Sequence, residues 1–202
     1  MSAAGAQREV ALFPLHAVLF PGGLLPLRIF EQRYMEMAKA CLKDDAPFGV
    51  CLIRKGSEVG APAQSEAVGC LARIAQWDMQ QLGLLQVTAR GERRFRVLGR
   101  RVEANGLAHA EIELLPEGAD AAVPAQFGAC TRLLQLVIEE YGSVLIEAPH
   151  RFESSSWVSA RLAEVLPVPL AAKQKLMELD DSLQRLEILH KFLAQHGLTA
   201  AR

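Results

Sequence analysis

Apolar and polar residues alternate along several stretches in the first half of the chain. Residues 107–114 contain one such stretch, in which every second residue from Ala108 onward is apolar and the residues between are polar. This period of two predicts a half-buried antiparallel strand. Residues 85–90 alternate in the same way, and so do residues 94–97 beyond Gly91. The two stretches on either side of this glycine predict a β-hairpin.

A longer apolar run lies near the start of the chain, where residues 10–27 carry no formal charge. A run of this length is typical of a membrane span or a secretion signal. Five helix-breaking residues interrupt it, namely Pro14, Pro21, Gly22, Gly23 and Pro26. A helix broken in this way would leave backbone groups unpaired in lipid. The run instead predicts two buried strands, at 9–13 and 24–29, joined by a turn at 20–23.

One helix is predicted directly after these strands, between Glu31 and Lys43. Its apolar residues recur at i, i+3, i+4 and i+7 and form one stripe, which consists of Tyr34, Met37, Ala38 and Cys41. Met35 lies off this stripe, so we expect it on the exposed side of the helix. Many short strands with one inserted helix favour a closed or nearly closed antiparallel sheet.

Beyond residue 118 the apolar period becomes helical. Three stripes predict helices that pack together: Leu134, Val137, Ile138 and Tyr141; Val158, Leu162, Val165 and Leu166; and Leu179, Leu183, Leu186 and Leu193. The serines at 154–156 offer N-cap oxygens to the second helix, and Pro167 and Pro169 mark its end. Gly197 is placed to stop the last helix.

The change of period divides the chain into two predicted parts, a sheet-rich part with one helix at residues 8–118 and a helical part at 119–202. A chain of 202 residues that is 50% hydrophobic has enough apolar material for one or two cored domains. Its formal net charge of -1 creates no general attraction to nucleic acid or anionic lipid. Any partner must therefore be recognised by local features.

Residue types that carry chemistry lack the spacing of known sites. The cysteines stand far apart in apolar segments and are expected to be buried and reduced: Cys41, Cys51, Cys70 and Cys130. The histidines show no metal-ligand spacing: His16, His109, His150, His190 and His196. The chain contains neither a G-x-S-x-G turn nor a G-x-x-x-x-G-K-[ST] phosphate loop. We expect no catalytic residue, no metal and no cofactor.

The only concentration of basic residues is a group of arginines, which consists of Arg90, Arg93, Arg94, Arg96, Arg100 and Arg101. It is a candidate phosphate-binding patch. Strand alternation divides its members between two faces, Glu92 and Glu103 flank it, and Phe95 is the only aromatic residue among them. Strong nucleic-acid binding is therefore not expected.

Short motifs recur along the chain in a specific order: F-P-G at 20–22, P-L-R-I-F-E-Q-R-Y at 26–34, F-G-V-C-L-I at 48–53, V-G-C-L-A-R-I at 68–74, G-E-R-R-F-R-V at 91–97, and K-Q-K-L-M-E at 173–178 followed by Asp180-Asp181 and Arg185-Leu186. This set resembles the N-terminal substrate-recognition domain of the Lon protease family. The resemblance covers roughly residues 8–195. It implies an α+β fold, with a PUA-like antiparallel β-barrel followed by a C-terminal helical bundle.

The resemblance also bears on activity. Full-length Lon proteases continue into an ATPase module and a Ser-Lys peptidase domain, and this sequence ends at Arg202 with neither. We therefore expect a non-catalytic, free-standing recognition domain that acts as an adaptor or regulator related to proteolysis. With a polar N-terminus at Arg8 and Glu9 and no cleavage site after the apolar run, the expected compartment is the cytoplasm.

The F-P-G and F-E-Q-R-Y region is expected to bind an unfolded polypeptide or a protein partner. Candidate contact residues are Phe20, Leu24, Leu25, Leu27, Phe30 and Met35. Residues expected to serve the structure alone are Pro21, Gly22, Glu31, Arg33 and Tyr34, with an ion pair or backbone contacts made by Glu31 and Arg33.

Within this region, substitution of Leu25, Leu27 or Tyr34 is expected to destabilise the fold, whereas Leu24 and Met35 are expected to tolerate polar residues. Simple packing of sheet against helix would account for the same apolar residues. Two other functions stay open, a nucleic-acid-binding barrel and a small-ligand sensor. The oligomeric state is also open, a weak homodimer included, and no membrane partner is expected.

Overall fold

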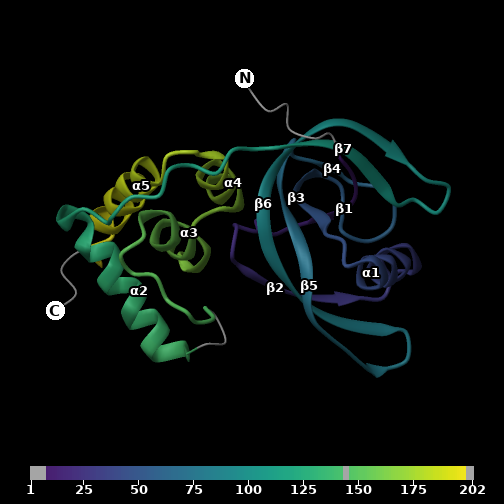
Figure 1. The fold of residues 1–202 in the computed structure, drawn as a ribbon, viewed down its shortest axis with the longest axis horizontal. Coiled ribbons are helices and arrows are strands. Elements are labelled where there is room, and N and C mark those ends of the chain that lie inside the picture. The colour runs from purple at the N-terminus through teal and green to yellow at the C-terminus, as the bar shows by residue number, and fades with distance from the viewer. Residues whose placement is uncertain (1–7, 143–145, 199–202) are drawn as a thin grey trace. The chain divides into compact units, whose positions relative to one another are not determined.

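The computed structural model describes residues 8–142 and 146–198, and the chain separates into two compact units, Met1–Pro116 and Glu117–Arg202 (Figure 1). The first unit contains one sheet and the helix α1 (Gln32–Asp44). Its strands are β1 (Arg8–Leu15), β2 (Leu24–Ile29), β3 (Phe48–Lys55), β4 (Gln64–Ser65), β5 (Val68–Gln81), β6 (Leu84–Val102) and β7 (Ala108–Leu114). The strands predicted at 9–13, 24–29 and 107–114 are confirmed.

The sheet is antiparallel at every pairing except one. Its strand order is β1-β7-β6-β5-β3-β4, with β2 added beside β6. The exception is a parallel pairing between β1 and β3, in which Leu12 lies opposite Gly49 and Leu15 opposite Leu52. Because β3 pairs with both β5 and β1, the hydrogen-bonded path from β1 through β7, β6, β5 and β3 returns to β1.

The predicted hairpin at Gly91 is wrong, because residues 84–102 form one continuous strand, β6. A glycine is needed at position 91 because two segments of the chain approach each other closely there, and not because the chain turns. Its N–H donates to the Gly23 carbonyl at 2.9 Å, and its carbonyl accepts from the Gly22 N–H at 2.8 Å. A Cβ atom at position 91 would lie 2.2 Å from the Phe20 carbonyl oxygen. Gly22, with φ of 76°, makes the turn that brings this segment back to β6.

Replacing Gly91 with alanine is therefore expected to lower the free energy of unfolding by at least about 2 kcal/mol through overpacking against the Phe20 backbone. Gly99 offers a matched control on the same strand, since the nearest atom to a Cβ there is Glu111 Oε2 at 3.8 Å. Gly99→Ala should leave the midpoint of urea unfolding within the error of the parent protein. Equal midpoints for the two variants would contradict the close approach at Gly91.

The core of the first unit forms where α1 packs on the sheet. Tyr34, Met37, Ala38 and Cys41 are buried, as their stripe predicts. Met35 is also buried, with 7% of its surface exposed, so its predicted exposure is wrong. The buried arc of α1 extends from Arg33 to Met35 and covers about 200° at 100° per residue, which is wider than a single stripe.

A second core cluster surrounds Phe95, which lies at the centre of β6 and is fully buried. It includes Leu12 of β1 and Ile112 of β7. The buried state predicted for the four cysteines is confirmed for Cys41, Cys51, Cys70 and Cys130. Burial raises the pKa of the Cys51 thiol to about 12 and that of Cys130 to about 11, so both thiols stay protonated and unreactive at neutral pH.

The second unit contains the helices α2 (Gly128–Tyr141), α3 (Ser155–Val165), α4 (Leu170–Glu178) and α5 (Ser182–Gln195), with a 3-10 turn at Ala125–Phe127. The predicted cap of α3 is confirmed, because the Ser154 hydroxyl accepts from the Trp157 N–H at 3.0 Å. Gly197, with φ of 70°, follows the end of α5 as predicted. No helix among the described residues combines the length and apolar character that a membrane span requires.

Three residues of the predicted helical stripes are not placed as expected. Leu166 is buried, but it follows the last residue of α3 and adopts an extended conformation. Tyr141 is exposed at the end of α2. Leu179 does not belong to α5, since it follows the last residue of α4 and adopts an extended conformation. Asp181 begins α5 instead, because its carboxylate accepts from the N–H groups of Leu183 and Gln184 at 2.8 and 3.2 Å.

Candidate functional site

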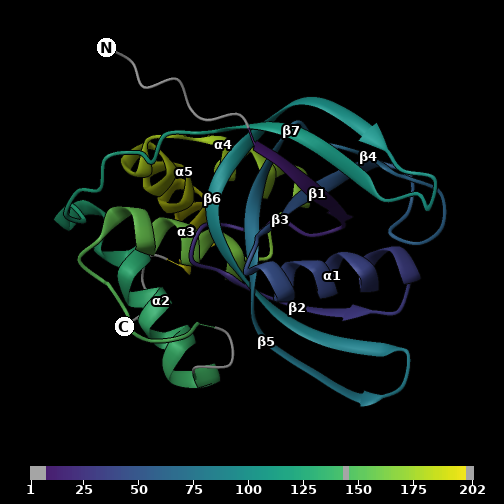
Figure 2. The same cartoon turned by 45° about the vertical axis from the view of Figure 1, so that its right-hand side comes forward.

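A gap in the strand pairing separates the end of β1 from β2. The ladder between β1 and β7 ends at the pair of Leu12 and Ala108. Beside β6, residues 85–90 pair with β2 and residues 95–102 pair with β7. Among the described strands, β2 pairs only with β6, so its other edge has no strand partner. In both views of the ribbon, β2 runs between α1 and the hairpin formed by β5 and β6 (Figure 2).

An apolar hollow of about 350 Å³ lies along this free edge. Its walls come from the end of β1, the length of β2, the first turn of α1 and the loop after β3. The apolar residues that line it are Phe13, Leu15, Ala17, Leu25, Pro26, Leu27, Ile29, Phe30, Tyr34 and Val59. Phe30 and Val59 are 56% and 52% exposed, so part of the rim of the hollow is apolar, and the charged residues Arg28, Glu31 and Glu58 complete the lining. The shape and lining suit an apolar side chain.

The ion pair predicted for Glu31 and Arg33 is confirmed at the base of this hollow. Arg33 is buried and donates from Nη2 to Glu31 Oε2 at 3.0 Å and from Nη1 to the Gly106 carbonyl at 3.0 Å. Its guanidinium carbon lies 4.6 Å from the centre of the Tyr34 ring. Tyr34 in turn stacks on Phe13 with ring centroids 4.1 Å apart. Burial raises the pKa of the Tyr34 hydroxyl.

The six predicted contact residues do not form one surface. Phe20 is fully buried and Met35 lies in the core, so neither is available to a partner in this conformation. Leu25, Leu27 and Phe30 line the hollow together. Leu24 is half-buried and lies outside the hollow lining.

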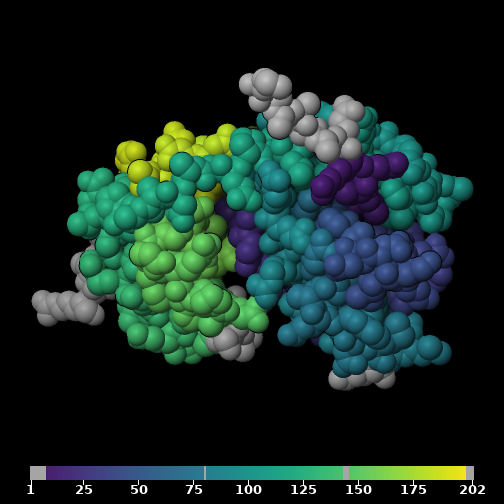
Figure 3. Space-filling view, viewed as in Figure 1, coloured from purple at the N-terminus to yellow at the C-terminus, as the bar shows by residue number. Residues whose placement is uncertain are grey.

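Sequence reasoning missed several apolar residues that are exposed near β2. Val59 stands in a loop of small residues, where an isolated branched apolar residue is a weak signal. Trp77, Met79 and Leu82 are exposed on the β5–β6 hairpin, which lies at the surface of the first unit (Figure 3). A second and more polar hollow of about 580 Å³ separates Trp77 from β2. Since Pro26, Leu27 and Arg28 line both hollows, β2 lies between them.

Most of the arginines predicted as a candidate phosphate patch bond to the protein itself. Arg94 donates to the Pro116 carbonyl, Arg93 to that of Leu115, and Arg100 to those of Ser65 and Glu66. These bonds use donors that a phosphate would need.

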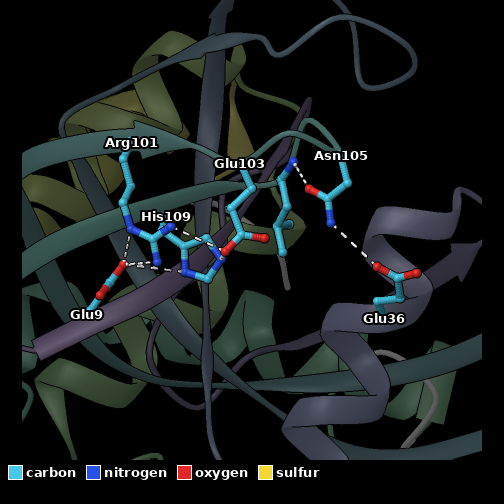
Figure 4. Close-up of polar contacts among 7 residues, drawn as sticks. Glu9, Glu36, Arg101, Glu103, Asn105 and His109 are labelled. Carbon is cyan, nitrogen blue, oxygen red and sulfur yellow. Dashed lines mark hydrogen bonds and ion pairs between the residues drawn. The ribbon is translucent and has the colours of Figure 1, made fainter.

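Arg101 belongs to a charged cluster across β1, β6 and β7 (Figure 4). Its guanidinium contacts Glu9 Oε1 at 2.5 Å and Glu103 Oε1 at 3.2 Å. His109 lies between the same two carboxylates, with Nε2 3.1 Å from Glu103 and Nδ1 3.7 Å from Glu9. Within residues 8–142 and 146–198, no group of three or more His, Cys, Asp or Glu side chains is placed to hold a metal ion.

A family model, the ATP-dependent protease La (LON) substrate-binding domain, matches residues 9–195. The Lon protease of Paraburkholderia phytofirmans is 28% identical over 191 residues, which is 90% of this chain and 23% of that protein. Protein cereblon of Danio rerio is 31% identical over 103 residues, which is 50% of this chain and 23% of that protein. The chain thus spans about a quarter of the length of these relatives.

Solved structures that resemble this one include two from Lon proteins. The Lon N-terminal domain protein from Xanthomonas campestris has a TM-score of 0.75 and 34% identity, with 90% of this chain and 96% of that chain covered. The N-terminal domain of Lon protease from the Mycobacterium avium complex has a TM-score of 0.66 and covers 94% of this chain and all of its own, and at 18% identity it shows likeness of fold alone. The family match over residues 9–195 and the Xanthomonas structure agree, and the chain belongs to the Lon substrate-binding domain family.

Proposed function

We propose that the first unit binds unfolded polypeptide segments at the hollow beside β2 and catalyses no reaction itself. The observation that carries this proposal is the apolar lining of the hollow together with its exposed rim at Phe30 and Val59. A contiguous exposed apolar surface of this kind is typical of a site that binds another chain. The substrate-binding role named for the family model supports the same assignment.

We also propose that the first unit is a PUA-like barrel and that the second unit is a helical bundle. The strand path that returns from β3 to β1 supports a PUA-like barrel, and the contacts that α3 makes with α2, α4 and α5 support a helical bundle. The nucleic-acid alternative is less well supported, since Arg94, Arg100 and Arg101 have protein partners. An adaptor or regulatory role in proteolysis follows as a proposal from polypeptide binding.

The rim of the hollow provides a direct test. Val59→Asp places a charge where an apolar side chain of the client would be desolvated, and it is expected to weaken binding of fluorescently labelled casein about tenfold. Val102→Asp is the matched control, because Val102 is 55% exposed and does not line the hollow. The measurement is a fluorescence anisotropy titration. Equal affinity of both variants and the parent would exclude the hollow as the binding site.

A further inference from the structure

The backbone hydrogen bonds of β2 determine which of its residues face the free edge. The pairing of Leu24 with Arg90, continued by one residue, places Gly23 opposite Gly91, and the Gly91 N–H donates to the Gly23 carbonyl. In an antiparallel ladder, residues that bond to the partner strand alternate with residues that point away from it. Leu25, Leu27 and Ile29 therefore bond to β6, and the backbone groups of Leu24, Pro26 and Arg28 point toward the gap.

The free edge of β2 carries two N–H donors and three carbonyl acceptors. The donors are those of Leu24 and Arg28, because proline has no N–H. In the part of the chain that the structure describes, neither residue has a hydrogen bond at this edge. Pro26 is exposed, and its backbone nitrogen points away from β6, so the missing N–H removes no hydrogen bond between β2 and β6. Edge strands tolerate proline at such positions.

We propose that a client polypeptide adds to this edge as an extended strand, which is a mode of binding that rests on the proposed function of the hollow. The occupant is a stretch of unfolded chain with apolar residues at every second position. Its backbone bonds to Leu24 and Arg28, and its alternate side chains enter the hollow lined by Leu27 and Phe30. Backbone pairing accepts any sequence, and the hollow selects for apolar side chains.

Pro26 limits how continuously another strand can pair with this edge. An uninterrupted free edge would pair continuously with other strands and aggregate. Pro26 removes the central donor, so between Leu24 and Arg28 an added strand can bond only to the Pro26 carbonyl and forms one hydrogen bond fewer. This arrangement suits a client that binds reversibly and is released.

The edge is tested by comparing Arg28→Pro with Arg28→Ala in the full chain. Both variants lack the guanidinium, and only the proline variant lacks the outward N–H. We expect Arg28→Pro to bind labelled casein about fivefold more weakly than Arg28→Ala, which is the effect of one lost hydrogen bond. Melting temperatures of both variants confirm that they are folded. Equal affinity of the two folded variants would overturn strand addition.

A second measurement needs no substitution. Amide hydrogen exchange of the parent protein should show fast exchange at Leu24 and Arg28 and slow exchange at Leu25 and Leu27. Saturating casein should slow the first pair at least tenfold. If Val59→Asp weakens casein binding and the Leu24 and Arg28 amides stay fast, the hollow binds the client and strand addition is wrong. If casein binding is absent from the parent protein, the proposed function itself fails.

Discussion

Replacing Phe20 with alanine is expected to lower the free energy of unfolding by about 3–5 kcal/mol, because a fully buried aromatic side chain is lost and a cavity remains. Phe30→Ala should change stability by less than about 0.5 kcal/mol, since Phe30 is 56% exposed. The effects on client binding should be reversed. Phe30→Ala should weaken casein binding, and Phe20→Ala should leave affinity per folded molecule unchanged.

Urea unfolding and anisotropy titration of the same two preparations measure these effects. Both residues lie in the segment that the sequence singles out for partner binding, and both substitutions remove the same ring. The pair therefore separates core packing from recognition. A stable Phe20→Ala variant with weakened binding would show that Phe20 becomes exposed when the client binds.

Local patterns in the sequence predicted the elements well. The strand at 107–114 and the helix after Glu31 follow from short-range periodicity, and the strand at 24–29 follows from a short apolar run next to turn residues. The cap of α3 at Ser154 also depends only on neighbouring residues. Such features are determined within a few residues, so one sequence is enough to find them.

The errors arose where distant parts of the chain meet. From its neighbours in the sequence alone, Gly91 predicts a turn. Only the approach of the Phe20 backbone explains why a glycine lies in the middle of a strand. Met35 lies off the apolar stripe of its helix, yet a wide arc of α1 packs on the sheet and buries it. Neither contact leaves a local signal.

The candidate site was predicted in part for the same reason. The sequence identified the correct segment, and Leu25, Leu27 and Phe30 do line one hollow. It could not assign Phe20 to the core, because the contact between residue 20 and β6 joins residues about 70 positions apart. Val59 and Trp77 come from other elements and line hollows beside β2, and only the folded chain brings them there.

In the second unit, Arg185→Met is expected to lower the free energy of unfolding by about 3–5 kcal/mol, since it leaves buried acceptors without donors. Arg185 is buried on α5 and donates to the carbonyls of Leu176 and Leu179 at 2.8 and 2.6 Å and to the Ser159 hydroxyl at 3.1 Å. The two carbonyls lie at the C-terminal end of α4, where a cation also interacts favourably with the negative end of the helix dipole.

The loss can be assigned to the second unit with a fluorescent reporter. The chain has two tryptophans, and Trp77→Phe leaves Trp157 of α3 as the only one. In this background, Arg185→Met should shift the Trp157 unfolding transition to lower urea, and Arg185→Lys should shift it less, because lysine keeps the charge and loses the forked geometry. Arg132→Met, at an exposed position of α2, is the control and should leave the transition in place. Coincident transitions for Arg185→Met and Arg132→Met would mean that other contacts hold α4 to α3 and α5.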